Sequence, residues 1–135
     1  MLTSFRKMGI RALVIMLAVL GCMGATLGTA NAAGITCRDI GNGLLCSNRI
    51  GYRQFDVWYD KRAGDSVDVV LGWRNMDGGV EYHNEWFTLR PGQRAFHSFP
   101  GGPGANWCAY ANLFSRPTSA PGATPQNFVG ALDCP

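Results

Sequence analysis

The stretch "TCRDIGNGLLCS" (residues 36–47) places two cysteines on either side of a Gly-Asn-Gly tip. With Gly41 and Asn42 as the central pair of a type II′ turn, the two flanking strands pair so that Cys37 faces Cys46. Counting outward from the turn makes this a non-hydrogen-bonded pair, in which α-carbons approach to about 4.5 Å and a disulfide fits. The stretch therefore predicts a β-hairpin closed by a Cys37–Cys46 disulfide.

Two further cysteines, Cys108 and Cys134, follow the hairpin, and by elimination they pair with each other. An even number of cysteines in a small exported chain is typical of a disulfide framework. A zinc knuckle would place its cysteines a few residues apart with further ligands nearby, and a redox pair would have C-x-x-C spacing. Neither spacing occurs, so we expect no metal, no cofactor and no redox chemistry at the cysteines.

The amino terminus predicts export. A positive segment (residues 6–11) precedes the apolar run "ALVIMLAVLG", which is too short to span a bilayer. The small residues Ala30 and Ala32 then frame a signal-peptidase site. We expect residues 1–32 to be a signal peptide and residues 33–135 to be a single domain that is secreted and extracellular.

Cys22 offers an alternative to free secretion. In "VLGC" a lipid could be attached to this cysteine, and the lipid would anchor the protein at the outer face of the membrane. Without that anchor we expect no contact with a membrane.

The charge of the expected mature domain argues against nucleic acid as a partner. Three of the twelve Lys and Arg residues lie in the signal peptide, which leaves nine against nine Asp and Glu. This nearly neutral domain has no basic stripe of the kind that binding to a phosphate backbone requires. Its length, 103 residues from Ala33 to Pro135, suits one domain with one modest core.

After residue 33 the sequence consists of short alternating runs separated by turns, and no stretch keeps a helical period. The turn signals recur at the spacing of sandwiches and barrels, so we expect an antiparallel all-β sandwich of about six to eight strands. Two runs alternate most clearly, "RQFDVWYD" and "SVDVVLGW". Their expected core faces are Phe55, Val57 and Tyr59 in the first, and Val67, Val69, Leu71 and Trp73 in the second.

The run "VEYHNEWFTL" (residues 80–89) follows a hairpin turn at Asp77-Gly78, and its apolar phase changes midway. A bulge near Asn84 would reconcile the two phases. The next turn, "LRPGQR", is expected to pair this strand with the "RAFHSF" run, which brings His97 opposite Glu85 or Trp86.

Catalytic motifs are absent from the sequence: there is no G-x-S-x-G, H-E-x-x-H, P-loop or EF-hand series. The best constellation is Glu81, His83 and Glu85 on one strand face, with His97 on the neighbouring strand. Such a group could hold a metal or act as acid and base in a small hydrolase. A solvated outer face is the commoner meaning of this pattern, so we expect no catalytic residues and no metal site.

Two polar segments lie between the predicted strands. Residues 60–65 contain acidic side chains but lack the oxygen series of a calcium loop, so they predict a polar hairpin tip. The segment "SRPTSAPGATPQ" (residues 115–126) is a long loop tethered at both ends by Cys108 and Cys134. It is either a presented binding loop or a tolerated insertion.

The tryptophans suggest two binding hypotheses, because exposed aromatic side chains anchor protein interfaces and stack on sugar rings. The first is a module that binds an extracellular protein, with an inhibitor of a secreted enzyme as one candidate. Its expected contact edge is Trp73, Arg74 and Asp77. The second is binding to cell-wall or extracellular polysaccharide through Trp58, Trp86 or Tyr82. Trp73 also continues a core face, which argues for its burial.

A family resemblance supports the predicted fold. The segments "CRDIGNGLLC", "VWYDKRAGDSVDVVLGWR" and "FTLRPGQ" resemble small secreted proteins of actinobacteria that are largely uncharacterised. The run from "VDVVLGWRNMDGG" to "FTLRPGQ" is similar to the second half of the tendamistat-type α-amylase inhibitors, which are two-disulfide β-sandwiches. Those inhibitors insert a Trp-Arg-Tyr tip from within their first disulfide loop, whereas the corresponding loop here holds only "RDIGNGLL". The resemblance therefore implies the fold more directly than amylase inhibition.

Overall fold

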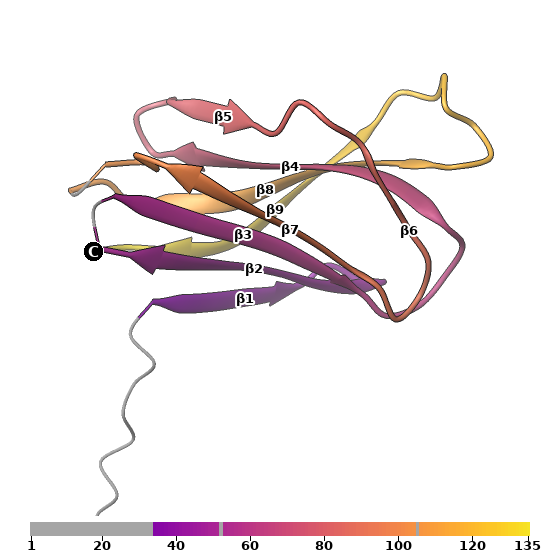
Figure 1. Cartoon of the computed structure of the whole chain (residues 1–135), viewed down its shortest axis with the longest axis horizontal. Coiled ribbons are helices and arrows are strands. Elements are labelled where there is room, and N and C mark those ends of the chain that lie inside the picture. The colour runs from indigo at the N-terminus through magenta and orange to yellow at the C-terminus, as the bar shows by residue number, and fades with distance from the viewer. Residues whose placement is uncertain (1–33, 52, 105) are drawn as a thin grey trace, which may run out of the picture. The chain divides into compact units, whose positions relative to one another are not determined.

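The computed structural model describes residues 34–51, 53–104 and 106–135, so the expected signal peptide and Cys22 lie outside the described residues. Residues Gly34–Pro135 form one compact unit. The described residues contain nine strands and no helix, arranged in two antiparallel sheets that pack face to face (Figure 1). This confirms the all-β fold, and both expected disulfides, Cys37–Cys46 and Cys108–Cys134, are present.

The first sheet has the strand order β1-β2-β3-β7. Its strands are β1 (Ile35–Asp39), β2 (Gly43–Ile50), β3 (Gln54–Lys61) and β7 (Arg94–Pro100). The second sheet has the order β5-β4-β8-β9, and β6 also pairs with β4. Its strands are β4 (Val67–Asn75), β5 (Val80–Tyr82), β6 (Phe87–Leu89), β8 (Ala109–Pro117) and β9 (Gln126–Asp133).

The opening hairpin forms as its turn residues predict. The Ile40 N–H donates to the Gly43 carbonyl at 3.0 Å, and Cys37 lies opposite Cys46 with the α-carbons 4.1 Å apart. Gly41 has a φ of 94°, in the region that a side chain disfavours, which explains glycine as the first turn residue. The disulfide therefore lies on the outer face of the first sheet, because Leu45 points inward.

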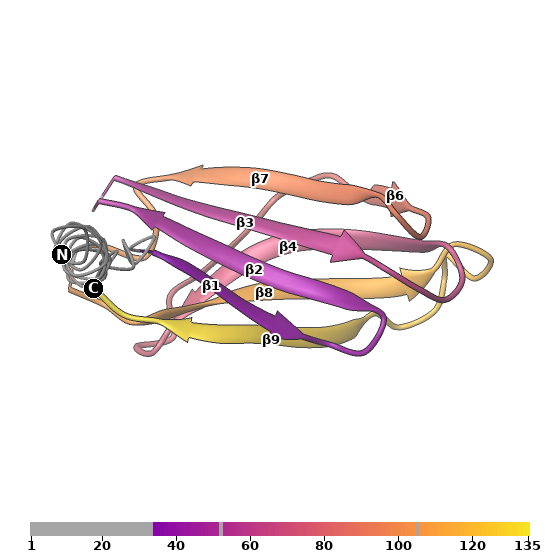
Figure 2. The same ribbon diagram turned by 90° about the horizontal axis from the view of Figure 1, so that it is seen from below.

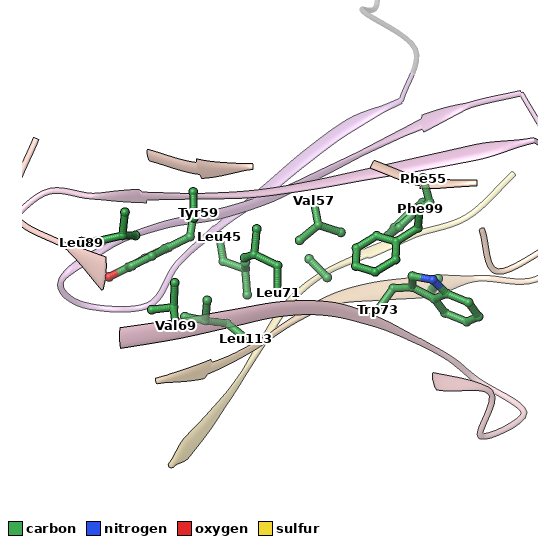
Figure 3. Packing of buried hydrophobic residues seen from close by; sticks show 13 residues of the cluster. Leu45, Phe55, Val57, Tyr59, Val69, Leu71, Trp73, Leu89, Phe99 and Leu113 are labelled. Carbon is green, nitrogen blue, oxygen red and sulfur yellow. The ribbon is translucent and has the colours of Figure 1, made fainter. Parts of the chain in front are cut away.

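The core lies between the inner faces of the two sheets, and alternation along the strands supplies it. Trp73 is 7 % exposed and packs at one end of the core, whereas Tyr59 reaches toward Leu89 at the other end (Figure 3). Burying each large apolar side chain contributes about 1.5–3 kcal/mol. The other large buried core residues are Leu45, Phe55, Val57, Val69, Leu71, Phe99 and Leu113.

The predicted strand over residues 80–89 is interrupted rather than bulged. Tyr82 ends β5 and Phe87 begins β6, and residues 83–86 between them are not in a strand. The change of apolar phase was predicted correctly, because Leu89 is buried while Tyr82 lies on the outer face of β4. With this break the described residues contain nine strands, one more than the upper end of the expected six to eight.

The expected pairing of residues 87–89 with residues 94–99 is wrong. β6 pairs with β4 in the second sheet, whereas β7 pairs with β3 in the first and lies beside it in Figure 2. The turn between β6 and β7 therefore crosses from one sheet to the other (Figure 1). His97 consequently lies opposite Val57 rather than Glu85 or Trp86.

Residues 60–65 do not form a hairpin tip: Asp60 and Lys61 end β3, and the residues after them lead from the first sheet to the second. β3 and β4 belong to different sheets, and Lys61, at the end of β3, is only 2 % exposed. Its position follows from alternation, because Lys61 shares the inward face of Val57 and Tyr59. Burying a lysine costs folding free energy unless its ammonium is paired with an opposite charge or hydrogen-bonded. Lys61 is therefore a candidate for a functional role.

Candidate functional site

Tyr82 lies flat on the outer face of the second sheet because β4 offers it a glycine. Gly72 pairs with Tyr82, and a Cβ at position 72 would collide with the Tyr82 ring and lie 2.6 Å from the Glu81 carbonyl oxygen. The ring reaches across β4 to β8, where the Tyr82 hydroxyl accepts a 2.8 Å hydrogen bond from the Asn112 amide. Its centroid lies 5.1 Å from that of Phe114.

An apolar groove of about 440 Å³ extends from the Tyr82 ring. Its floor is formed by strands β4 and β8, which contribute Val70 and Phe114. One wall comes from the segment between β5 and β6, and the other from the loop between β8 and β9, which projects beyond the sheet (Figure 1). The lining residues are Val70, Tyr82, Trp86, Phe114, Thr124 and Pro125.

Arg116 holds both walls of the groove in place. Its guanidinium carbon lies 3.9 Å from the centroid of the Trp86 ring, a cation–π contact, and its Nη1 donates to the Pro121 carbonyl at 2.6 Å. Its Nε lies 3.6 Å from a carboxylate oxygen of Asp68. Trp86 is therefore restrained although it is 40 % exposed. Because its side chain is already ordered, less conformational entropy is lost when a ligand binds.

The residues proposed for binding from the sequence fall into three separate places. Tyr82 and Trp86 share the groove. Trp58 lies on the outer face of the first sheet, where it pairs with Cys46 and Phe96. The remaining three residues belong to β4 and the turn after it: Trp73, Arg74 and Asp77.

Trp73 is not available to a partner, because its indole is buried and Nε1 donates to a carboxylate oxygen of Glu81 at 3.1 Å. Arg74 and Asp77 are exposed, but the expected edge beside them therefore lacks its aromatic anchor. This geometry makes the groove the stronger candidate site.

Five contributors to the groove were not among the predicted binding residues: Val70, Phe114, Arg116, Thr124 and Pro125. Alternation along β4 and β8 places Val70 and Phe114 on the outer face, and their pairing makes them neighbours. That alternation was visible in the sequence, but the pairing of β4 with β8 was not. The long loop, predicted as either a presented loop or an insertion, supplies Thr124 and Pro125.

The two histidines meet between β7 and the segment after β5. The ring centroids of His83 and His97 lie 4.0 Å apart, although His97 lies in β7 of the first sheet and His83 follows β5 of the second. Within the described residues, the hydrogen-bond partners of His83 Nδ1 are backbone atoms of Glu85, at 3.2–3.3 Å. Among the described residues, no three His, Cys, Asp or Glu side chains are grouped as a metal site would require.

His97 makes stability depend on pH. Burial lowers its pKa below the ordinary 6.5, the charge of His83 lowers it further, and Glu81 opposes them. The unfolded chain then binds more protons in this range, so the free energy of unfolding falls as pH drops through 6.5. When the pH is lowered from about 7.5 to about 5.5, we expect the free energy of unfolding of His97→Phe to fall by less than that of the wild type. Urea unfolding at the two pH values measures both decreases. Equal losses would contradict this assignment.

No protein-family model, no curated protein and no solved structure matches this chain. Its class is therefore defined by its own features: a two-disulfide antiparallel β protein with a restrained aromatic groove on one outer face. The disulfides indicate an oxidising compartment. Nothing in the described part of the chain forms a helix that could cross a membrane.

Proposed function

We propose that the protein is a secreted, non-catalytic binding protein whose groove receives an apolar side chain of an extracellular protein. The observation that carries the proposal is the groove itself, in which the exposed Trp86 and the half-buried Tyr82 lie over a floor of Val70 and Phe114. Its volume of about 440 Å³ lies within the range of small-ligand pockets, roughly 300–1,000 Å³. Tryptophan and tyrosine are also enriched among the residues that dominate binding energy at interfaces.

The chemistry of the lining favours an apolar side chain over a sugar. The groove offers few side-chain polar groups: Thr124, the Trp86 indole N–H and the Tyr82 hydroxyl, whose oxygen already accepts a hydrogen bond from Asn112. A sugar ring carries several hydroxyls, and those left without partners in the groove would each cost binding free energy. An aromatic or aliphatic side chain has no such requirement.

The rigidity and lining of the groove support binding rather than catalysis. The floor consists of paired strands, and Arg116 links Trp86 to the loop that forms the opposite wall. No titratable side chain except Tyr82 lines the groove, so it offers no general acid or base near neutral pH. A rigid apolar groove in a disulfide-linked domain suits recognition outside the cell.

A displayed library of random peptides tests the proposal without a known partner. Peptides are selected on the immobilised wild type and then screened against Trp86→Ala and Trp58→Ala. We expect the selected peptides to share an apolar anchor residue, to bind Trp58→Ala and to lose binding to Trp86→Ala. Trp58 is the matched control, because it is a partly exposed tryptophan on the other sheet.

Two results would overturn the proposal. One is a set of peptides that binds Trp86→Ala as well as the wild type. The other is retention of the wild type on insoluble polysaccharide that Trp86→Ala abolishes, which would assign the groove to a carbohydrate.

A further inference from the structure

A second hollow, of about 340 Å³, lies at the end of the sandwich where the first hairpin turn meets the loop between β8 and β9. It lies between the two sheets, and its apolar wall includes Val67, Leu113 and Phe128. Thr124 lines both this end cavity and the aromatic groove, whereas Ala123 faces the cavity and Pro125 the groove. The loop therefore separates two distinct hollows.

Lys61 lines the end cavity, and its ammonium has fewer hydrogen-bond acceptors than N–H donors. Its ammonium donates to the Ala63 carbonyl at 2.6 Å, and no second acceptor for it is found among the described residues. An ammonium has three N–H donors, so two lack a protein partner at a residue that is 2 % exposed. Burial lowers the pKa of Lys61, and the nearby Asp65 opposes this effect.

The charge around the end cavity complements an anion. Lys61 and Arg116 line it, and none of its lining residues is Asp or Glu. Three acids act nearby: Asp65 acts on Lys61, Asp39 acts on Tyr59, and Asp68 lies 3.6 Å from Arg116.

The Tyr59 hydroxyl adds a neutral donor to this cavity. Burial raises the pKa of Tyr59, and the charge of Asp39 raises it further, so the phenol remains protonated. No hydrogen bond to another described residue engages this hydroxyl. The cavity thus combines a buried cation and a free donor with an apolar wall.

We propose that the end cavity binds a small amphiphilic carboxylate, such as a medium-chain fatty acid. The carboxylate accepts hydrogen bonds from the Lys61 ammonium, and the hydrocarbon chain lies against Val67, Leu113 and Phe128. Charge-assisted hydrogen bonds of this kind are among the strongest that proteins make. The proposal is independent of the aromatic groove.

Octanoate is the probe, octanol is its neutral analogue, and titration calorimetry is the measurement. We expect octanoate to bind the wild type at least about tenfold more tightly than octanol does. Lys61→Met should remove this preference, because the cation is lost while the length of the side chain is kept. Arg62→Met is the matched control: Arg62 is the next cation along the chain, it is exposed, and its loss should leave the preference intact.

Chemical-shift mapping of the wild type keeps the proposal testable if Lys61→Met fails to fold. Octanoate should shift the resonances of Leu113 and Phe128 and leave those of Trp86 unchanged. Equal affinities for octanoate and octanol, no binding of octanoate at millimolar concentration, or shifts confined to the aromatic groove would each overturn the proposal.

Discussion

Arg49→Met is expected to lower the free energy of unfolding by about 3–5 kcal/mol, because it removes one partner of a buried charge pair. The Arg49 side chain is 9 % exposed, and its Nε lies 3.6 Å from a carboxylate oxygen of Asp133, whose side chain is 4 % exposed. Its two terminal nitrogens donate to the carbonyls of Gly104 and Trp107 at 2.8 Å. The substitution leaves the buried Asp133 carboxylate without its cationic partner. It also leaves the two carbonyls without the guanidinium that donates hydrogen bonds to them.

The double variant Arg49→Met/Asp133→Asn separates the charge from the packing. Burial raises the pKa of Asp133, and Arg49 opposes that rise, so neutralising the aspartate relieves the uncompensated charge. We expect the double variant to recover part of the loss in urea unfolding. Arg94→Met is the exposed control: its partner is Asp60, its side chain is 57 % exposed, and we expect a loss below about 1 kcal/mol. A loss at Arg49 as small as that at Arg94 would contradict the assigned role.

Replacing Cys108 and Cys134 together with alanine is expected to lower the free energy of unfolding by about 3.5 kcal/mol. These cysteines are 26 positions apart in sequence, whereas Cys37 and Cys46 are 9 apart. A disulfide stabilises mainly by restricting the unfolded chain, and the restriction grows with the length of the closed loop. The shorter bridge is therefore expected to contribute less, about 2.7 kcal/mol.

Urea unfolding of the two double-alanine variants measures this order directly. Loss of both bridges removes about 6 kcal/mol, which is comparable to the whole stability of many small domains, so the reduced chain should unfold. A larger loss from the Cys37–Cys46 pair than from the Cys108–Cys134 pair would show that loop length does not determine the contributions here.

The features that follow from neighbouring residues were predictable from the sequence. The Cys37–Cys46 pairing rests on one turn and on alternation within a short hairpin, and the structure reproduces it. The inward faces of β3 and β4 were also correct, including burial of Trp73. In each case the period of two in a strand decides which side chains share a face.

The neighbours of each strand were harder to predict. Consecutive strands usually pair, but here β6 and β7 belong to different sheets. The groove could not be predicted for the same reason, namely that the strand pairing was unknown. Tyr82 meets Phe114 only because β4 pairs with both β5 and β8. Lys61 could have been recognised as inward-facing, since it continues the alternation of Val57 and Tyr59, but its charge favoured an exposed tip.

The most direct test of the account is the dissociation constant of the best selected peptide for the wild type, Trp86→Ala and Trp58→Ala, measured by titration calorimetry. If the groove is the binding site, Trp86→Ala should weaken binding by about 30-fold or more, the effect of losing a dominant interface residue. Trp58→Ala should change the dissociation constant by less than about threefold, because Trp58 lies on the other sheet. A Trp86→Ala variant that binds the peptide as tightly as the wild type would contradict the assignment of the groove.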